Sequence, residues 1–209
     1  KKFVPAWDSW RESNNRFFDV ARQVIDSGIL RPQQLQRDLE TFRGDHRELE
    51  LQVVDLMKSG KHFDGGDNHN QCAFGKWLTE YETTNPAVLA AMRDVADPHR
   101  EFHSLVKQIK QLTAAGKSAE AQALYTEKLR PVVSQTFGGL DRMRAEAAKV
   151  NDLSERAEAL AFGECRDRQE EAAGLLDQIV QENRKVAKTE VDSATSQSAF
   201  LKVLSLVAM

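Results

Sequence analysis

The segment from Pro86 to Thr113 reads PAVLAAMRDVADPHREFHSLVKQIKQLT, and its spacing decides the fold. Its apolar positions recur at intervals of four and three residues, and they include Val88, Met92, Val95, Phe102, Val106 and Ile109. Helices packed in a bundle have this spacing because it keeps one apolar stripe facing the neighbouring helices. The segment therefore predicts an amphipathic helix, which Gly116 ends.

Three other stretches have the same spacing, and they cover residues 3–24, 35–56 and 129–150. Between the second stretch and Pro86 lies a polar loop, HFDGGDNHNQ, over residues 62–71. The chain reads as helix again after Asn151. A single helix from residue 118 to residue 209 would be about 140 Å long. We therefore expect a break or kink at Gly163, and a bend at Pro131 or at the pair Gly138–Gly139.

Composition excludes several classes of protein. Hydrophobic residues make up 41% of the 209 residues and the formal net charge is −3, without a long basic run, so we expect no nucleic-acid partner. Two cysteines, Cys72 and Cys165, are too few for a disulfide framework. The sequence contains no complete membrane span. Its apolar end, Ala199–Met209, fits either the start of a span or the end of an amphipathic helix.

Histidines interrupt two of the apolar stripes. His99 and His103 are four residues apart, which places both imidazoles on one helical face. His46 occupies an apolar position of the preceding stripe, between Phe42 and Leu49. A buried neutral histidine needs a hydrogen-bond partner, and a metal ion satisfies one of its nitrogens. The alternative interpretation is that these histidines lie at the edge of the core without binding a metal.

Cys72 adds a fourth candidate ligand, because the turn around it can fold the sulfur back onto the bundle. One thiolate with the three imidazoles of His46, His99 and His103 suits Zn(II), which prefers tetrahedral nitrogen and sulfur ligands. Ligand softness alone leaves copper and iron open. The alternative interpretation of Cys72 is a small buried apolar residue, as most free cysteines are.

Residues around these four have predicted supporting roles. Asp45 and Asp97 are candidates to orient the imidazoles. Gly75 is expected to supply a backbone conformation that other residues resist. Phe74 and Trp77 are expected to fill the end of the bundle and fix the turn at Cys72.

The remaining residues with ligand chemistry receive weaker assignments. His62 and His69 lie in the polar loop and are expected to be exposed, with His69 as a possible substitute for one of the four ligands. Cys165 is expected to be structural or an incidental thiol near the helix break.

The segment CAFGKWL (residues 72–78), preceded by His46 and followed by HREFH (residues 99–103), resembles the chemoreceptor zinc-binding (CZB) domain. That family has a His in one helix, a Cys-x-(Leu/Phe)-Gly-x-Trp turn and a later His-x-x-x-His. The resemblance covers residues 33–150 and implies a four-helix bundle, one zinc ion bound by His46, Cys72, His99 and His103, and a homodimer.

The resemblance and the helical pattern together predict an all-α, up-and-down antiparallel four-helix bundle with long terminal helices. Residues 1–32 and 151–209 would form a coiled extension on the zinc-binding bundle of residues 33–150. Such an extension resembles the ectodomain of a methyl-accepting chemotaxis receptor. We therefore expect a membrane-tethered receptor with this segment in the periplasm, or alternatively in the cytoplasm, and a signalling domain downstream in the same chain.

Three functions compete at this point. In the first, the module relays zinc or oxidant status along its terminal helices. In the second, zinc only stabilises the bundle, and the module senses another small molecule. In the third, the site is a zinc enzyme, which needs an open coordination position and a general base. Four protein ligands leave no open position, and no HExxH motif or nucleophile elbow is present, so we expect no enzyme.

Overall fold

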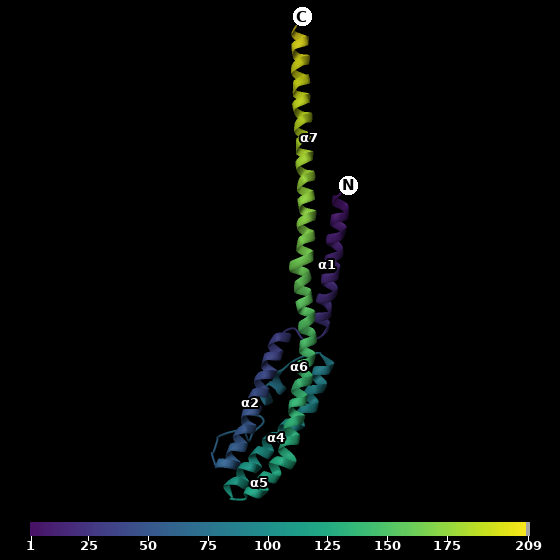
Figure 1. Ribbon diagram of the computed structural model, residues 1–209. Coiled ribbons are helices and arrows are strands. Elements are labelled where there is room, and N and C mark those ends of the chain that lie inside the picture. The colour runs from purple at the N-terminus through teal and green to yellow at the C-terminus, as the bar shows by residue number, and fades with distance from the viewer. Residues whose placement is uncertain (208–209) are drawn as a thin grey trace. The chain divides into compact units, whose positions relative to one another are not determined.

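The computed structural model describes residues 1–207, with side chains through Val203, and these residues form helices and loops without a strand (Figure 1). The predicted all-α fold is therefore confirmed. The α-helices are α1 (Phe3–Asp26), α2 (Pro32–Ser59), α3 (Ala73–Glu80), α4 (Pro86–Ala114), α5 (Ser118–Leu124), α6 (Arg130–Ala159) and α7 (Arg166–Val207). Two π-helical segments are η1 (Tyr125–Leu129) and η2 (Leu160–Cys165).

The chain divides into two compact units. The larger unit contains residues 21–155. The smaller unit pairs residues 1–20 with the helix that follows Arg156. Within it α1 and α7 run antiparallel, as predicted for the terminal helices. The side chain of Arg16 donates to Glu164 at 2.5 Å, while Phe3 and Ile179 line one surface pocket near the start of α1.

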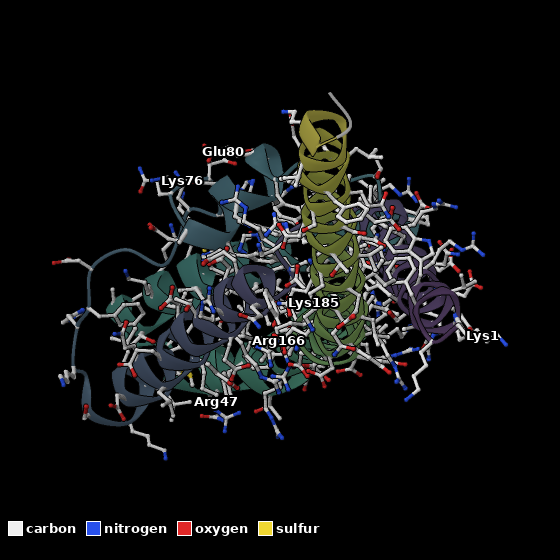
Figure 2. All side chains as sticks on the ribbon, turned by 90° about the horizontal axis from the view of Figure 1, so that it is seen from above. Lys1, Arg47, Lys76, Glu80, Arg166 and Lys185 are labelled. Carbon is white, nitrogen blue, oxygen red and sulfur yellow. The ribbon has the colours of Figure 1, made fainter. Side chains whose placement is uncertain are left out.

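The larger unit is built on α2, α4 and the helix formed by α5, η1 and α6. Apolar stripes of these helices form its core, which includes the fully buried Leu35, Leu39, Val53, Phe74, Val88, Val95, Phe102, Val106, Ile109, Leu129 and Met143. Charged side chains such as Arg47 on α2 and Lys76 and Glu80 on α3 are exposed (Figure 2). Burial of the stripes is the main force that holds the helices together.

Capping residues fix where α4 begins and where α2 ends. Asn85 is buried, and its side-chain oxygen accepts from the N–H of Val88 at 2.9 Å, which caps α4. Its amide nitrogen donates to the carbonyl of Ser27 at 2.8 Å, so the same residue also fixes the end of α1. Gly60 adopts a left-handed conformation that ends α2.

Of the break or kink expected at Gly163, the break is wrong, because helical residues run without interruption from Ser118 to Val207. The slip in the apolar period is absorbed instead by η2, because a π turn accommodates an extra residue without ending a helix. A second π segment, η1, precedes Pro131. In η1 the N–H of Arg130 donates to the carbonyl of Tyr125. This bond spans five residues beside a proline that has no N–H to donate.

Gly139 has a packing role that the sequence does not reveal. A Cβ at this position would lie 2.6 Å from Cβ of Val95, so the missing side chain lets α6 approach α4 closely. The neighbouring Gly138 has open space around it.

Among the described residues, no helix is both long and apolar enough to cross a membrane. The apolar end predicted over Ala199–Met209 continues α7 as far as Val207, and Ala208 and Met209 lie outside the described residues.

Candidate metal centre

The structure brings His46, Cys72, His99 and His103 together inside the larger unit. Their ligand atoms all lie within 4.8 Å of one another. His46 comes from α2, Cys72 directly precedes α3, and both other histidines come from α4. The three histidines are buried, and Cys72 is half-buried. Four residues that are up to 57 positions apart in sequence therefore meet at one point.

Three of the six distances among the four ligand atoms fit a tetrahedral metal. Nε2 of His99 lies 3.1 Å from Nε2 of His46 and 3.1 Å from Nε2 of His103, while Sγ of Cys72 lies 3.5 Å from Nε2 of His46. Tetrahedral zinc with ordinary bond lengths places two nitrogens about 3.3 Å apart, and a nitrogen and a sulfur about 3.6 Å apart. The donor set therefore needs shifts of only a few tenths of an ångström along these three edges.

Backbone carbonyls determine which ring nitrogens face the centre. Nδ1 of His46 lies 2.6 Å from the carbonyl oxygen of Phe42, and Nδ1 of His103 lies 2.8 Å from that of Gly66. A carbonyl only accepts, so Nδ1 must carry the proton in both rings. Nε2 is then unprotonated and directs its lone pair at the other ligands. In the absence of a metal, the donors within reach of these two nitrogens are the thiol of Cys72 and an Nε2–H of His99.

Burial keeps the three imidazoles neutral. It lowers the pKa of His46 below its ordinary value, despite an opposing bond to the carbonyl of Phe42. Burial, with the neighbouring histidines, lowers the pKa of His99 to about 2. Burial also lowers the pKa of His103 to about 4, against the bond to Gly66. Neutral imidazole is the form that binds a metal, so the folded chain presents these ligands ready for one.

Cys72 differs in its protonation state. Burial raises the pKa of its thiol above the ordinary value, and the backbone N–H groups of Gly75 and Phe74 oppose that rise. Metal binding must therefore remove a proton from the sulfur.

Residues 46–110 match the chemoreceptor zinc-binding domain. The match covers about a third of the chain and includes all four ligand candidates. This family is a zinc-binding sensory module and not a family of enzymes, and it implies zinc as the metal. No curated protein and no solved structure matches the chain.

Within the matched segment, α3 fixes the position of Cys72. Phe74 is fully buried, and its ring lies 4.9 Å from that of His99 and 5.9 Å from that of His46. Trp77 is half-buried and stacks on Tyr81, with a ring separation of 4.4 Å. Phe74 therefore packs against the middle of α2 and α4, where it forms a wall of the site, and does not fill the end of the bundle as predicted.

Gly75 is needed for a different reason from the one predicted. Its φ is not positive, and it lies inside α3. A Cβ there would lie 1.8 Å from the carbonyl oxygen of His69 and 3.3 Å from Cε1 of His99. Glycine is therefore required by the close approach of α3 to the loop before it, rather than by backbone conformation.

The aspartates predicted to orient the imidazoles do not do so. Asp45 and Asp97 are exposed, and Asp97 pairs with Arg100 at 3.1 Å. The carbonyls of Phe42 and Gly66 take that role. The Phe42 contact was predictable in principle, because the carbonyl four residues before a helical histidine lies within its reach. The Gly66 contact depends on the path of the loop.

The other two histidines lie outside the group of four. His62 is exposed, as predicted. His69 is half-buried instead of exposed, and its ring lies 6.3 Å from that of His99. The backbone of His69 packs against α3, which explains its burial. Cys165 is buried within η2, consistent with a structural residue.

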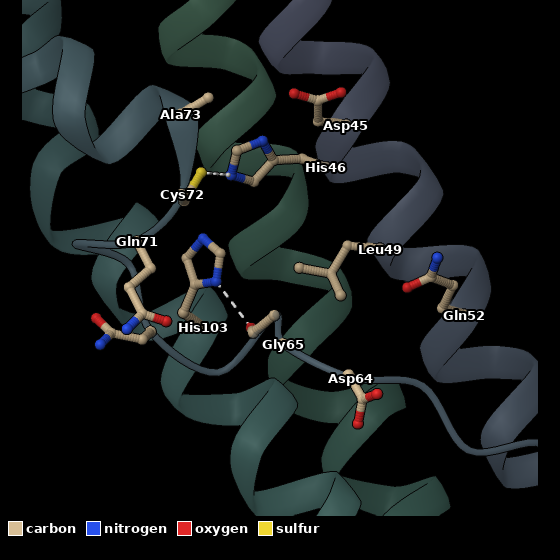
Figure 3. A pocket seen from close by; sticks show the side chains of 12 residues that line it. Asp45, His46, Leu49, Gln52, Asp64, Gly65, Gln71, Cys72, Ala73 and His103 are labelled. Carbon is tan, nitrogen blue, oxygen red and sulfur yellow. Dashed lines mark hydrogen bonds between the residues drawn. The ribbon is translucent and has the colours of Figure 1, made fainter.

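A pocket of about 380 Å³ opens beside the cluster. His46, Cys72 and His103 lie on its wall, with Leu49 and Gln71 nearby (Figure 3). The sulfur of Cys72 is thus reachable by a small solute, although the three histidines are almost wholly buried.

Proposed function

We propose that this chain is the sensory module of a bacterial chemotaxis receptor that binds one Zn(II) through His46, Cys72, His99 and His103. Zinc occupancy, or the oxidation state of the Cys72 sulfur, is relayed through α6 and α7 to a signalling domain downstream. The module works as a homodimer in a membrane-tethered receptor. Its site is periplasmic, with the cytoplasm as the alternative location.

The convergence of three imidazole Nε2 atoms and one thiol carries the zinc part of this proposal. Two of the histidines direct Nε2 inward because backbone carbonyls hold their Nδ1 protons. Three imidazole nitrogens and one sulfur that meet at these distances are a ligand set that tetrahedral zinc prefers. The match of residues 46–110 to a zinc-binding family supports zinc over copper or iron.

The open pocket beside Cys72 supports the oxidant part. Hydrogen peroxide that enters the pocket would oxidise the thiolate to sulfenic acid and be reduced to water. Sulfenic acid is a poorer ligand than thiolate, so the zinc shell would lose one of its four donors. The relay is supported by the uninterrupted helix from Ser118 to Val207, which contains both α6 and α7.

Metal content tests the site. The wild type should contain one zinc per chain by elemental analysis after dialysis, and His99→Ala should lose most of it. His62→Ala is the matched control, because His62 is exposed and lies outside the group of four. Equal zinc in the wild type and in His99→Ala would overturn the site.

The closed shell of four protein ligands favours a second function, in which zinc only stabilises the bundle. Hydrogen exchange in α6 and α7, followed while zinc or peroxide is added, separates the two functions. The sensor predicts changes in both helices that Cys72→Ala abolishes without unfolding the protein. If exchange changes only around α2 and α4, zinc has a structural role.

A further inference from the structure

A second pocket, of about 370 Å³, borders the metal site on the side of His99. His99, Gly75, Leu78, Leu89 and Met92 line it, with Arg93 and Arg100 among the remaining lining residues. None of the eleven lining residues is acidic. This pocket shares no lining residue with the pocket beside Cys72.

His99 differs from the other two histidines in one respect. No described group accepts a hydrogen bond from its Nδ1, whereas Nδ1 of His46 and of His103 each face a carbonyl. Among the described side chains, Asn151 Oδ1 is the only fully buried polar atom without a partner. Nδ1 of His99 therefore keeps an opening to solvent, although the residue as a whole is 1% exposed.

Zinc binding makes this nitrogen a donor. A neutral imidazole that gives Nε2 to a metal must carry its proton on Nδ1. Metal-bound histidines almost always donate that proton to a carboxylate, a carbonyl or a water. Since the protein offers His99 no acceptor, the acceptor must come from the pocket that His99 lines.

The charges around the pocket favour an anion. Arg93 has no ion pair among the described residues, and Arg100 pairs only with the exposed Asp97. His69 also lines the pocket. The lining is otherwise largely apolar, through Leu78, Leu89 and Met92. An apolar floor beside cationic groups fits a ligand that combines a carboxylate with a hydrocarbon group.

We propose that this pocket binds a small organic carboxylate whose oxygen accepts a hydrogen bond from Nδ1 of zinc-bound His99. The proposal rests on the zinc site proposed above. Binding at the pocket and at the metal would be coupled in both directions, because the carboxylate makes the imidazole a stronger ligand and zinc fixes the proton that the carboxylate needs.

Benzoate is a suitable probe, with benzyl alcohol as the uncharged analogue and acetate as the analogue without a ring. In zinc-loaded protein, benzoate should shift the Nδ1 proton resonance of His99 in nitrogen-15 NMR spectra and leave those of His46 and His103 nearly unchanged. Saturating benzoate should raise zinc affinity about tenfold, measured by competition with a chelator. Benzyl alcohol and acetate should each bind at least about tenfold more weakly than benzoate.

Two variants test the groups assigned to the pocket. Arg93→Gln should weaken benzoate binding about tenfold without changing zinc content. Leu89→Asn should weaken the binding of benzoate but not the binding of acetate, because acetate has no ring to contact Leu89. The control is Arg37→Gln, an exposed arginine on α2 that lines neither pocket.

The outcomes separate this proposal from the zinc site. If zinc binds but benzoate leaves the His99 resonance unmoved, the pocket holds only water and the carboxylate site is overturned while the zinc site stands. Equal binding of benzoate and benzyl alcohol would also overturn it. If the wild type binds no zinc, the proposed function fails. In that case, calorimetric titration of the zinc-free protein with benzoate tests whether the pocket binds a carboxylate. If benzoate does not bind, the carboxylate site is overturned as well.

Discussion

Cys72 is the one ligand among the four whose protonation state must change when the metal binds. Burial already keeps His46, His99 and His103 neutral, whereas it keeps the Cys72 thiol protonated near neutral pH. The pH dependence of zinc affinity near neutral pH is therefore set mainly by one sulfur, and Cys72 also lines an open pocket together with His46 and His103.

We predict that zinc binding releases about one proton per chain at pH 7, because only the thiol has a proton to lose. Calorimetric titrations in buffers of different ionisation enthalpy measure this number directly. Cys72→Ser should release almost none and bind zinc more weakly, since a hydroxyl keeps its proton. A release of two or more protons would mean that the imidazoles are charged before the metal arrives.

The short helix α3 positions Phe74 and the turn at Cys72 through close packing. It places Phe74 against two of the histidines and holds the turn at Cys72, and it can do so only because Gly75 has no side chain. Any residue larger than glycine must move either α3 or the backbone at His69.

Gly75→Ala should lower the free energy of unfolding of the zinc-free protein by about 1–3 kcal/mol, as overpacking does. It should also weaken zinc binding about tenfold or more, because the turn at Cys72 shifts with the helix. Urea denaturation and chelator competition measure the two effects. Gly44→Ala is the control: Gly44 lies in α2 with open space around it, so alanine there should be neutral or stabilising. Equal effects of the two changes would refute the packing argument.

The sequence predicts α2 and α4 for a simple physical reason. Apolar spacing reports which face of a helix is buried, and so it predicted α2 and α4 together with the histidines that face inward from them. Spacing does not report how an irregular period is accommodated, so it predicts a break or kink at Gly163 and does not reveal the π turn of η2. Contacts that depend on the path of the loop before α3, such as Gly66 with His103, lie beyond any local pattern.

The depressed pKa values of the histidines also affect the molecule as a whole. Each group has a lower pKa when folded than when unfolded, so below pH 6.5 the unfolded chain binds more protons. The free energy of unfolding of zinc-free protein should therefore fall as the pH drops below about 6.5. The contribution of His103 is lost down to about pH 4, and that of His99 at still lower pH.

Urea denaturation of zinc-free protein from pH 7.5 to pH 4.5 tests this dependence. His103→Gln should make it shallower, because one of the titrating groups is removed. His62→Gln, in the exposed loop, serves as the control. Stability that stays constant, or that rises on acidification, would contradict the burial of neutral imidazoles.

Three tryptophans report separately on the two units. Trp7 and Trp10 belong to the smaller unit, and Trp77 lies in α3 of the larger one. All four ligand candidates belong to the larger unit. A ligand that binds only the folded state stabilises it by about 4 kcal/mol when its free concentration is a thousand times the dissociation constant. Zinc should therefore raise the melting temperature that Trp77 reports by several degrees.

The relay requires that zinc also shift the melting temperature of the smaller unit. A variant with Phe at positions 7 and 10 leaves Trp77 as the reporter, and Trp77→Phe leaves the other two. If α6 transmits the state of the metal site, zinc must also shift the transition seen by Trp7 and Trp10, because a helix that is continuous through residue 155 joins the two units. A shift seen by Trp77 alone would leave a zinc-stabilised bundle that does not communicate with its terminal helices.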